Sequence, residues 1–315
     1  MMRRTAASRP SVGFPEPPLT GELAVELPPG TRCGVLLSHD VDHLSLREHF
    51  VDGFLLRYMV NLFRQNLLRR RPRPWRLLDG LFGVAAAAAG RDRWRTVPSL
   101  IDAELRAGLP STWFVAVRPG RGIAYGRSEL VGLLDRLSRS GRDIGLHGQV
   151  HTDGAALAEE VETLRRLSGR PVEGLRMHYL KLSRGVLDGM QRAGLRYDST
   201  VMDRSRLDPR VHPLAAPRLM REGVIEVPLH VMDSTLFSVT GLGLSGDEAI
   251  AYTRELLDRA RELGRVVVLN LHPNAYSRQT PEIRRWYDWL LGEISSRSDI
   301  LPTDFRGLLP RIVRP

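Results

Sequence analysis

The feature that most constrains the fold is a regular alternation of short apolar runs with helix-like stretches. The apolar runs predict buried strands at 34–38, 112–117, 143–147, 174–177, 196–198, 224–229 and 266–271. Helix-like patterns occur between most of them, at 97–108, 128–140, 155–168, 184–193 and 247–264. Strands that alternate with helices predict a mainly parallel sheet with crossover helices, and about seven such units favour a barrel over an open sheet. We expect this domain to occupy residues 31–315.

The first apolar run leads directly into the hexapeptide SHDVDH, residues 38–43. Asp40 and Asp42 are two residues apart, so in extended backbone their side chains point the same way. Two neighbouring carboxylates repel each other unless a cation, a shared proton or an arginine compensates. These residues alone leave two interpretations open: a functional site, or a loop whose aspartates cap a following helix.

Histidines follow two other predicted strands. His147 and His151 in DIGLHGQVH are four residues apart, and one helical turn would place both rings on one side, where they could bind one metal ion. The carboxyl ends of parallel strands meet at one rim, so these histidines would lie near SHDVDH. Two histidines and one aspartate leave a position for water or substrate, as in a catalytic zinc site. His272, after the run at 266–271, is either a general acid at this rim or a histidine that caps a loop.

Composition limits the other classes of function. The single cysteine, Cys33, excludes an intramolecular disulfide and a cysteine-rich metal site. Residues 44–98 hold 11 arginines and four acidic residues, which accounts for most of the net charge of +10. We expect no nucleic-acid partner, because no helix-turn-helix, zinc finger or aromatic RNA-binding motif is present.

The same basic segment interrupts the alternation and predicts an amphipathic helix within 46–71 and a second helix at 77–89. The segment is either a helical insertion packed on the barrel, or a surface that contacts an anionic membrane through residues 46–71. Residues 1–30 predict a flexible tail with a short strand near Leu23, and they contain no secretory signal pattern. No apolar run approaches the roughly 18 residues of a membrane span. We therefore expect a cytoplasmic protein, peripheral at the inner membrane face if the second interpretation holds.

Seven short motifs together resemble the polysaccharide deacetylases, the NodB-homology group of carbohydrate esterase family 4. In chain order they are SHDVDH, STWFVAV, DIGLHGQVH, GLRMHY, LRYDST, EVPLHVMDS and LNLHP. The first motif resembles the branch that has HDVD in place of the commoner FDDG. The resemblance covers residues 31–310, with 44–98 as an insertion after the first strand. It implies a distorted (β/α)7 TIM-like barrel, one divalent metal ion, usually zinc, and hydrolysis of N-acetyl groups on sugars.

By position in these motifs, the resemblance implies a role for each site residue. Asp40 corresponds to the catalytic base and Arg176 to the arginine that holds it. Asp42, His147 and His151 correspond to the metal ligands. His272 corresponds to the general acid, with Asp233 as its partner. Leu271 corresponds to the pocket for the acetyl methyl group.

Several residues depart from the family pattern. Arg176-Met-His178-Tyr179 stands where an Arg-Pro-Pro-aromatic sequence is common, so His178 and Tyr179 are expected in the substrate pocket. His39 and His43 could compete as ligands, although we expect them to support the site or lie at its rim. The predicted substrate is an acetamido sugar in a polysaccharide, a glycolipid or a glycan precursor. Two alternatives remain: hydrolysis of another C–N bond, in a cyclic amide or ureide, and a glycan- or membrane-binding protein without catalysis.

Overall fold

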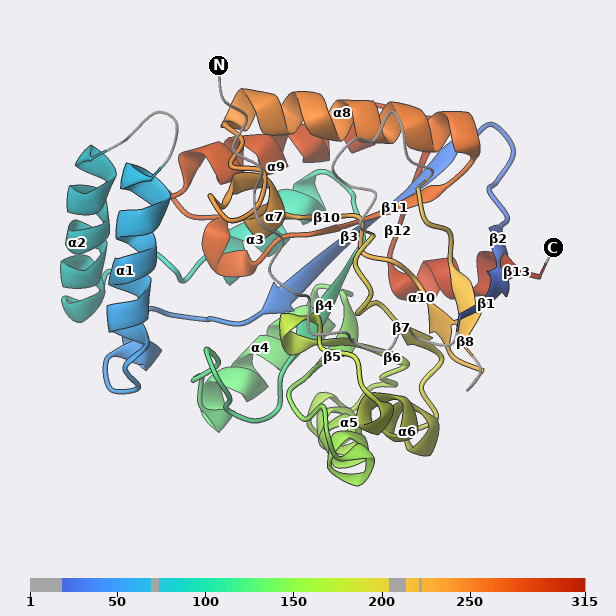
Figure 1. Cartoon of the computed structure of the whole chain (residues 1–315), viewed down its shortest axis with the longest axis horizontal. Helices are drawn as coiled ribbons and strands as arrows, with labels where there is room; N and C mark the ends of the chain where they lie inside the picture. Colours follow the sequence, from blue (N-terminus) through green and yellow to red (C-terminus); the bar gives the residue numbers. More distant parts are fainter. Residues whose placement is uncertain (1–18, 69–73, 204–213, 221–222, 315) are drawn as a thin grey trace, which may run out of the picture.

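A curled, mainly parallel sheet surrounded by helices forms the body of the protein (Figure 1). The computed structural model describes residues 19–68, 74–203, 214–220 and 223–314. The parallel strands that correspond to the seven predicted ones are β3 (Cys33–Val41), β4 (Ser111–Val115), β5 (Asp143–Gly148), β6 (Gly174–Met177), β7 (Tyr197–Asp198), β9 (Ile225–Glu226) and β11 (Val266–Asn270). Their order, β9-β7-β6-β5-β4-β3-β11, follows the chain except that β11 lies beside β3. The predicted distorted α/β barrel is confirmed.

One continuous segment joins the two ends of this row of strands. Its first part, β9, pairs with β7, and five residues later β10 (Val231–Met232) pairs with β11. Both strands have only two residues, which is why the barrel is distorted rather than regular. The remaining strands pair at the margins: β12 (Ile300–Thr303) with β3, β1 (Leu19–Glu22) with β8 (Arg218–Met220), and β2 (Ala24–Val25) with β13 (Ile312–Val313). Part of the segment predicted as a tail is therefore paired to the domain.

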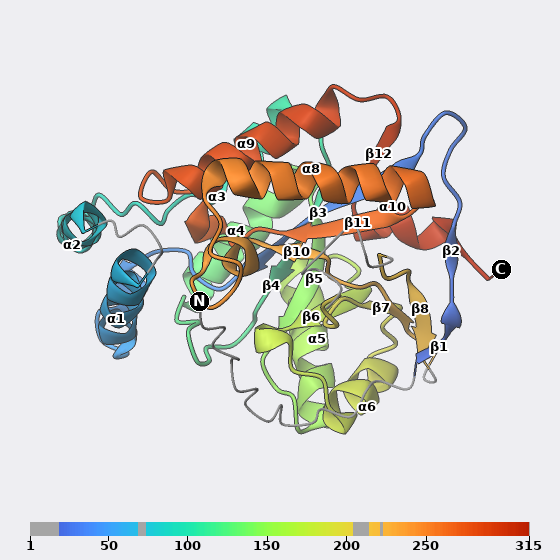
Figure 2. The ribbon, with the colours of Figure 1, turned by 45° about the horizontal axis from the view of Figure 1, so that its top comes forward.

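Helices cover the outside of the sheet (Figure 2). They are α3 (Val97–Arg106), α4 (Arg127–Arg139), α5 (Gly154–Ser168), α6 (Arg184–Arg192), α8 (Gly246–Leu263) and α9 (Pro281–Ser295), with the short α7 (Asp233–Phe237) and α10 (Phe305–Leu308). Local sequence fixes the ends of several of them. Ser245 and Glu248 form a capping box at the start of α8, and Gly264 ends it with a φ of 63°, a left-handed conformation that glycine adopts without strain.

Alternation along the strands separates an outer face from an inner face. On β3, Val35 and Leu37 point outward into the main hydrophobic core beneath the helices, whereas Leu36 belongs to a smaller inner cluster with Phe114 and Val268. Continuing the alternation, His39 falls on the outer face and Asp40 on the inner face. The strand therefore places these two neighbours in different environments.

The insertion after β3 forms a pair of helices, α1 (Phe54–Leu67) and α2 (Trp75–Ala88), at one side of the barrel (Figures 1 and 2). Phe54, Leu55 and Tyr58 pack against a small buried cluster that includes Leu46 and Trp94. The insertion therefore has a small core of its own. Across the described part of the chain, every helix is too short or too polar to span a bilayer.

Candidate metal and catalytic site

Asp40 lies at the carboxyl end of β3 and is almost completely buried. Arg176 Nη1 donates to Asp40 Oδ1 at 3.0 Å, and Asn270 Nδ2 donates to Oδ2 at 3.0 Å. Burial opposes ionisation, but the Arg176 guanidinium, together with His147 and His272, lowers the pKa of the Asp40 carboxyl below its usual value. Asp40 is therefore an ionised acceptor at the strand end, with one lone pair on each oxygen still available.

Arg176, at the end of β6, is fully buried and held from several sides. Nε donates to the carbonyl oxygen of Ser199, Nη2 to Ser199 Oγ, and Nη1 also reaches Ser38 Oγ at 2.9 Å and Asn270 Oδ1 at 3.0 Å. The guanidinium carbon lies 4.4 Å from the centre of the Phe114 ring. These contacts fix the guanidinium that pairs with Asp40. Sequence analysis gave no role to Ser38, Ser199 and Asn270, although Ser38 belongs to SHDVDH and the other two stand at strand ends.

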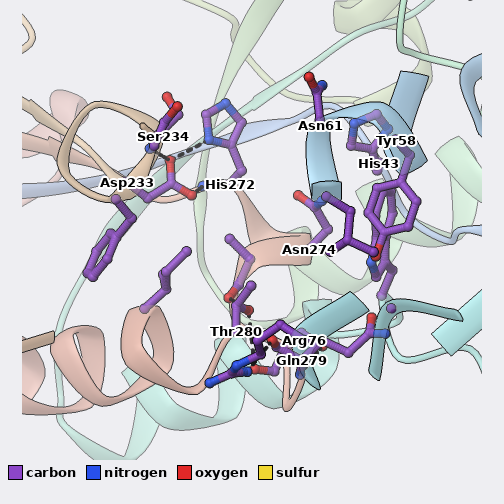
Figure 3. A pocket seen from close by; sticks show the side chains of 18 of the residues that line it. His43, Tyr58, Asn61, Arg76, Asp233, Ser234, His272, Asn274, Gln279 and Thr280 are labelled. Carbon is purple, nitrogen blue, oxygen red and sulfur yellow. Dashed lines mark hydrogen bonds and ion pairs between the residues drawn. The ribbon is translucent and has the colours of Figure 1, made fainter. Parts of the chain in front are cut away.

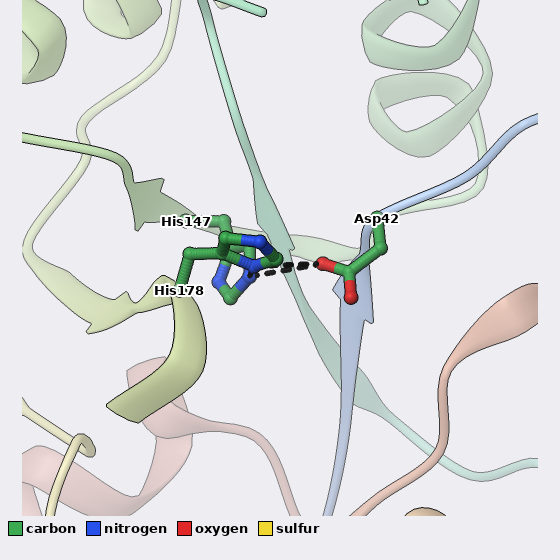
Figure 4. A group of neighbouring side chains, drawn as sticks. All are labelled: Asp42, His147 and His178. Carbon is green, nitrogen blue, oxygen red and sulfur yellow. Dashed lines mark hydrogen bonds and ion pairs between the residues drawn. The ribbon is translucent and has the colours of Figure 1, made fainter. Parts of the chain in front are cut away.

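Asp42 meets two histidines at the same rim (Figure 4). Asp42 Oδ1 lies 3.1 Å from His147 Nε2 and 3.3 Å from His178 Nδ1, and these two nitrogens are 3.0 Å apart. Donors about 2.0–2.1 Å from a tetrahedral ion are about 3.3–3.5 Å from one another, so this triangle has nearly the dimensions of three zinc ligands. The three atoms form one of the groups of side chains in the described residues that could bind a metal ion.

The opposite ring nitrogens of both histidines support this interpretation. His147 Nδ1 lies 3.0 Å from the carbonyl oxygen of Arg176, and His178 Nε2 lies 2.9 Å from that of Arg121. A carbonyl only accepts, so each of these nitrogens carries a proton, and in the neutral ring the nitrogen that faces Asp42 has a lone pair. Three acceptors then face one another, and Asp42 Oδ1 is buried without a hydrogen-bond partner in the described part of the chain. Such a set of donors fits a divalent cation.

His178 takes the position in this cluster that the sequence analysis gave to His151. His147 lies within β5, and the next helix, α5, begins only at Gly154. The spacing of four residues between His147 and His151 therefore does not place the two rings on one helical face. His151 lies in the intervening loop, half-buried, where its carbonyl oxygen accepts a hydrogen bond from Ser183 Oγ. His178 follows β6 directly, so the strand-end rule could have found it.

Of the two other residues expected in the substrate pocket, Tyr179 lies at the surface with its ring centre 4.0 Å from that of His178, and Leu271 lies in the core. Tyr179 is exposed, has a φ of 58°, and donates to the carbonyl oxygen of Arg121. Its left-handed backbone directly follows His178, and such strain in a residue with a side chain is most frequent at functional sites. Leu271 is fully buried in the outer hydrophobic core, because alternation along β11 points Asn270 inward and Leu271 outward.

His272 and Asp233 form a pair beside Asp42. His272 Nδ1 lies 2.6 Å from Asp233 Oδ1, the backbone N–H of His272 donates to Asp233 Oδ2, and His272 Nε2 lies 3.7 Å from Asp42 Oδ2. Burial disfavours the charged ring, but Asp233, together with Asp42 and Asp40, raises the pKa of His272 to about 10. Asp233 thus holds Nδ1–H, which leaves Nε2 as the nitrogen that faces the site.

A cavity of about 470 Å³ opens beside this site (Figure 3). Asp42, Asp233 and His272 line one part of it, and helix α1 supplies much of the opposite wall, with Tyr58 and Asn61 among the lining residues. The insertion therefore forms part of the space next to the candidate catalytic groups. No pattern in the sequence indicates this contact, because 44–98 and 272–283 are far apart along the chain.

The other histidines near SHDVDH do not join the Asp42 cluster. On the outer face, His39 Nε2 lies 2.6 Å from Glu104 Oε1 and Nδ1 lies 2.9 Å from the carbonyl oxygen of Leu271. His43 Nδ1 lies 2.7 Å from His49 Nε2 in the insertion. His39 therefore stabilises the end of β3 through contacts on the outer face of the sheet. His43 connects the end of β3 to the insertion.

Comparisons with known proteins identify the fold. No protein-family model matches the chain, and no curated protein matches its sequence. A structure from Mycobacterium smegmatis assigned as a polysaccharide deacetylase matches with a TM-score of 0.62 and 21% identity, over 93% of this chain and 94% of that one. A second structure with that assignment, from Pseudomonas aeruginosa PAO1, matches with a TM-score of 0.56 and 14% identity, over 90% and 92%. The PuuE allantoinase also matches with a TM-score of 0.56 and 14% identity, over 98% and 97%. The chain has the fold of the polysaccharide deacetylases.

Proposed function

We propose that this protein is a metal-dependent hydrolase that removes N-acetyl groups from an acetamido sugar in a polysaccharide, a glycolipid or a glycan precursor. The observation that carries the proposal is the triangle of Asp42, His147 and His178 beside two further titratable groups, Asp40 and His272. A binding protein needs no base and acid around a cation site, whereas amide hydrolysis needs both. The fold shared with proteins assigned as polysaccharide deacetylases supports the same class of reaction.

The cation would be held by Asp42, His147 and His178, and zinc is the expected ion because two imidazoles and a carboxylate suit it. When bound, it would make water a stronger nucleophile and polarise the acetyl carbonyl group. Asp40, ionised and fixed by Arg176, would accept the proton of the attacking water. His272 would donate a proton from Nε2 to the departing amine, with Asp233 holding the ring in place.

The test is acetate release from N-acetylated sugars, oligosaccharides and glycolipids by the purified protein, with added zinc and with a chelator. We expect release with zinc and at least a tenfold lower rate with the chelator. His178→Gln should lose the zinc ion at Asp42 and the activity together, whereas His151→Gln is the matched control and should retain both. If the zinc-loaded protein releases no acetate from any substrate, the assignment to acetylated sugars is wrong.

The same assay includes the two alternative functions. The allantoinase neighbour favours one of them, because its name denotes hydrolysis of a cyclic ureide on this fold. Turnover of small cyclic amides or ureides without acetate release would support that alternative. Zinc binding and glycan binding with no hydrolysis of either class would instead indicate a non-catalytic glycan-binding protein.

We also propose that the insertion contacts an anionic membrane, on the cytoplasmic side that the sequence favours, and brings the site to a lipid-linked substrate. Ten of the 14 large apolar side chains that are exposed in the described residues lie between Phe50 and Phe82. On α1 they form a stripe of Leu56, Val60 and Phe63. Packing of the insertion on the barrel explains the apolar side chains on the inner face of the helices. It does not explain those that are exposed on the outer face. Apolar side chains together with arginines are typical of helices that lie in the membrane interface.

Arginines and a second apolar stripe support this partner. Arg57 and Arg64 are exposed on α1 beside its stripe, and on α2 the exposed apolar side chains are Trp75, Leu78, Leu81 and Phe82. The inner side of the same α1 lines the cavity. A membrane bound to the outer side would therefore lie near the entrance for a lipid-linked sugar.

Co-sedimentation with vesicles of phosphatidylcholine, with and without phosphatidylglycerol, tests this contact. We expect binding to the anionic vesicles at low salt, and at least a tenfold loss of affinity when Leu56, Val60 and Phe63 are replaced by serine. Replacing the exposed Leu105 and Val131 by serine is the matched control and should leave binding unchanged. Equal recovery in the supernatant with and without vesicles would contradict the proposal, and a concentration-dependent dimer that the serine variant abolishes would show that a second copy covers the surface instead.

A further inference from the structure

A second cluster of metal-ligand side chains lies at the base of the insertion, outside the site described above. His43 Nδ1 is 2.7 Å from His49 Nε2, Glu48 Oε1 is 3.2 Å from His49 Nε2, and His43 Nδ1 is 3.9 Å from Glu48 Oε1. The three distances span the value of about 3.3–3.5 Å expected between ligands of a tetrahedral ion. All three residues come from the short sequence HLSLREH, which is part of the turn between β3 and α1.

Burial makes this cluster costly without a compensating charge. The side chain of His49 is fully buried, that of Glu48 is 3% exposed and that of His43 is 11% exposed. Glu48 Oε2 is buried with no hydrogen-bond partner in the described residues. A carboxylate oxygen that is removed from water and left without a donor destabilises the fold unless a cation is close.

The surroundings also orient the ligand atoms. His49 Nδ1 lies 2.7 Å from Asp52 Oδ2, so it donates its proton there and directs the lone pair of Nε2 toward Glu48 and His43. A carboxylate behind a ligating imidazole is the usual arrangement in metal sites. The backbone N–H of Leu44 donates to Glu48 Oε1, and the rings of Phe54 and Trp94 enclose both histidines.

We propose that His43, Glu48 and His49 bind a second divalent cation, of the zinc class, that fastens the insertion to the end of β3. The ion would tie the residue that follows Asp42 to the turn that leads into α1. Helix α1 in turn lines the cavity, so the second ion would position the cavity wall. The competing arrangement has no ion: His49 carries an extra proton and donates it to His43, beside Glu48.

Metal stoichiometry distinguishes the two arrangements. The full-length protein is stripped of metal, titrated with Zn²⁺ by calorimetry and, in parallel, with Co²⁺ by absorption spectroscopy. We expect two ions per chain in the wild type, and one in Glu48→Gln and in His49→Gln. His178→Gln should also bind one ion, because it loses the other site. His151→Gln is the matched control and should bind two.

Glu48→Gln keeps the shape of the side chain, so the test remains valid if His49→Gln fails to fold. A second measurement uses hydrogen exchange: Zn²⁺ should slow exchange of the amides in 44–60 in the wild type and in His178→Gln, but not in Glu48→Gln. A single ion in the wild type that Glu48→Gln retains and His178→Gln loses would overturn the proposal. So would two ions in the wild type that Glu48→Gln and His49→Gln both keep. Neither measurement depends on catalysis, so the outcome is independent of the proposed deacetylase activity.

Discussion

The rim of the barrel and the insertion differ in where the partners of their carboxylates come from. At the rim, Asp40 is compensated by Arg176, a cation from another strand that is itself fixed by several hydrogen bonds. In the insertion, Glu48 and Asp52 both lie against His49, which comes from the same short turn. The rim thus draws its partners from strands that are distant in sequence, whereas the insertion draws them from within about ten residues. Changes at the rim should therefore have the larger effects on both catalysis and stability.

The largest expected effect is on catalysis. Asp40→Asn should lower kcat/KM for the hydrolysed substrate by about 10²–10⁴-fold, because the proton acceptor is lost while its shape is kept. Metal content should stay at the wild-type value in this variant. Loss of metal from Asp40→Asn would mean that the roles of Asp40 and Asp42 are exchanged. Arg91→Gln, an exposed change in the insertion away from the α1 stripe, should leave kcat/KM unchanged and serves as the control.

The next effect is on stability. Arg176→Met should lower the free energy of unfolding by about 3–5 kcal/mol, because it leaves the buried Asp40 carboxylate without its cation. Arg64→Met, on the exposed side of α1, should change it by less than about 0.5 kcal/mol. Urea denaturation of both variants measures the difference. Similar losses of unfolding free energy in the two variants would show that the rim does not contribute more to stability than the insertion does.

Metal removal should have an intermediate effect. A cation that binds only the folded chain stabilises it by about 2.7–4.1 kcal/mol when present at 100 to 1,000 times its dissociation constant. Stripping the protein with a chelator should lower the melting temperature, and zinc should restore it in the wild type and in His151→Gln. The restoration should be smaller in His178→Gln, since that variant has lost a ligand at the rim. An equal restoration in His178→Gln would exclude the ring of His178 as a ligand.

The smallest effect concerns a buried carboxyl pair behind the rim. Burial and the neighbouring Asp198 raise the pKa of Glu226 well above its usual range. In the unfolded chain Glu226 loses its proton near its ordinary pKa of about 4.3, whereas the folded chain keeps it to higher pH. The folded state binds more protons in this window, so this group lowers stability as pH rises from about 4.3 through the folded pKa.

Glu226→Gln should therefore reduce the fall in stability with rising pH, by on the order of 1 kcal/mol between pH 5 and 8. Urea denaturation at several pH values gives this slope. The exposed Glu162, paired with Arg165, provides the control variant Glu162→Gln, whose slope should match the wild type. A wild-type slope in Glu226→Gln would show that the carboxyl pair does not titrate in this range.

Much of the rim could be predicted from the sequence because strands obey simple rules. The apolar runs gave the positions of β3, β5, β6 and β11, and the polar residues that follow them gave Asp40, Asp42, His147 and His272 as neighbours. Alternation along β11 also explains why Leu271 lies in the core. The resemblance to a family had instead implied that Leu271 lies in the pocket for the acetyl methyl group. The expectation that His151 joins His147 assumed a helical turn, whereas the chain continues as a strand and then a loop, and the structure places His178 beside His147 instead.

The sequence by itself determined the parallel α/β architecture, the location of the insertion and the set of strands whose ends carry chemistry. It could do so because hydrophobic periodicity is local and each strand end is marked by the residue that follows it. Only the tertiary structure decided that His178 joins Asp42 and His147, that Ser199 and Asn270 hold Arg176 and Asp40, and that α1 lines the cavity. Each of these contacts joins residues far apart along the chain, and packing of the sheet and helices decides which of them meet.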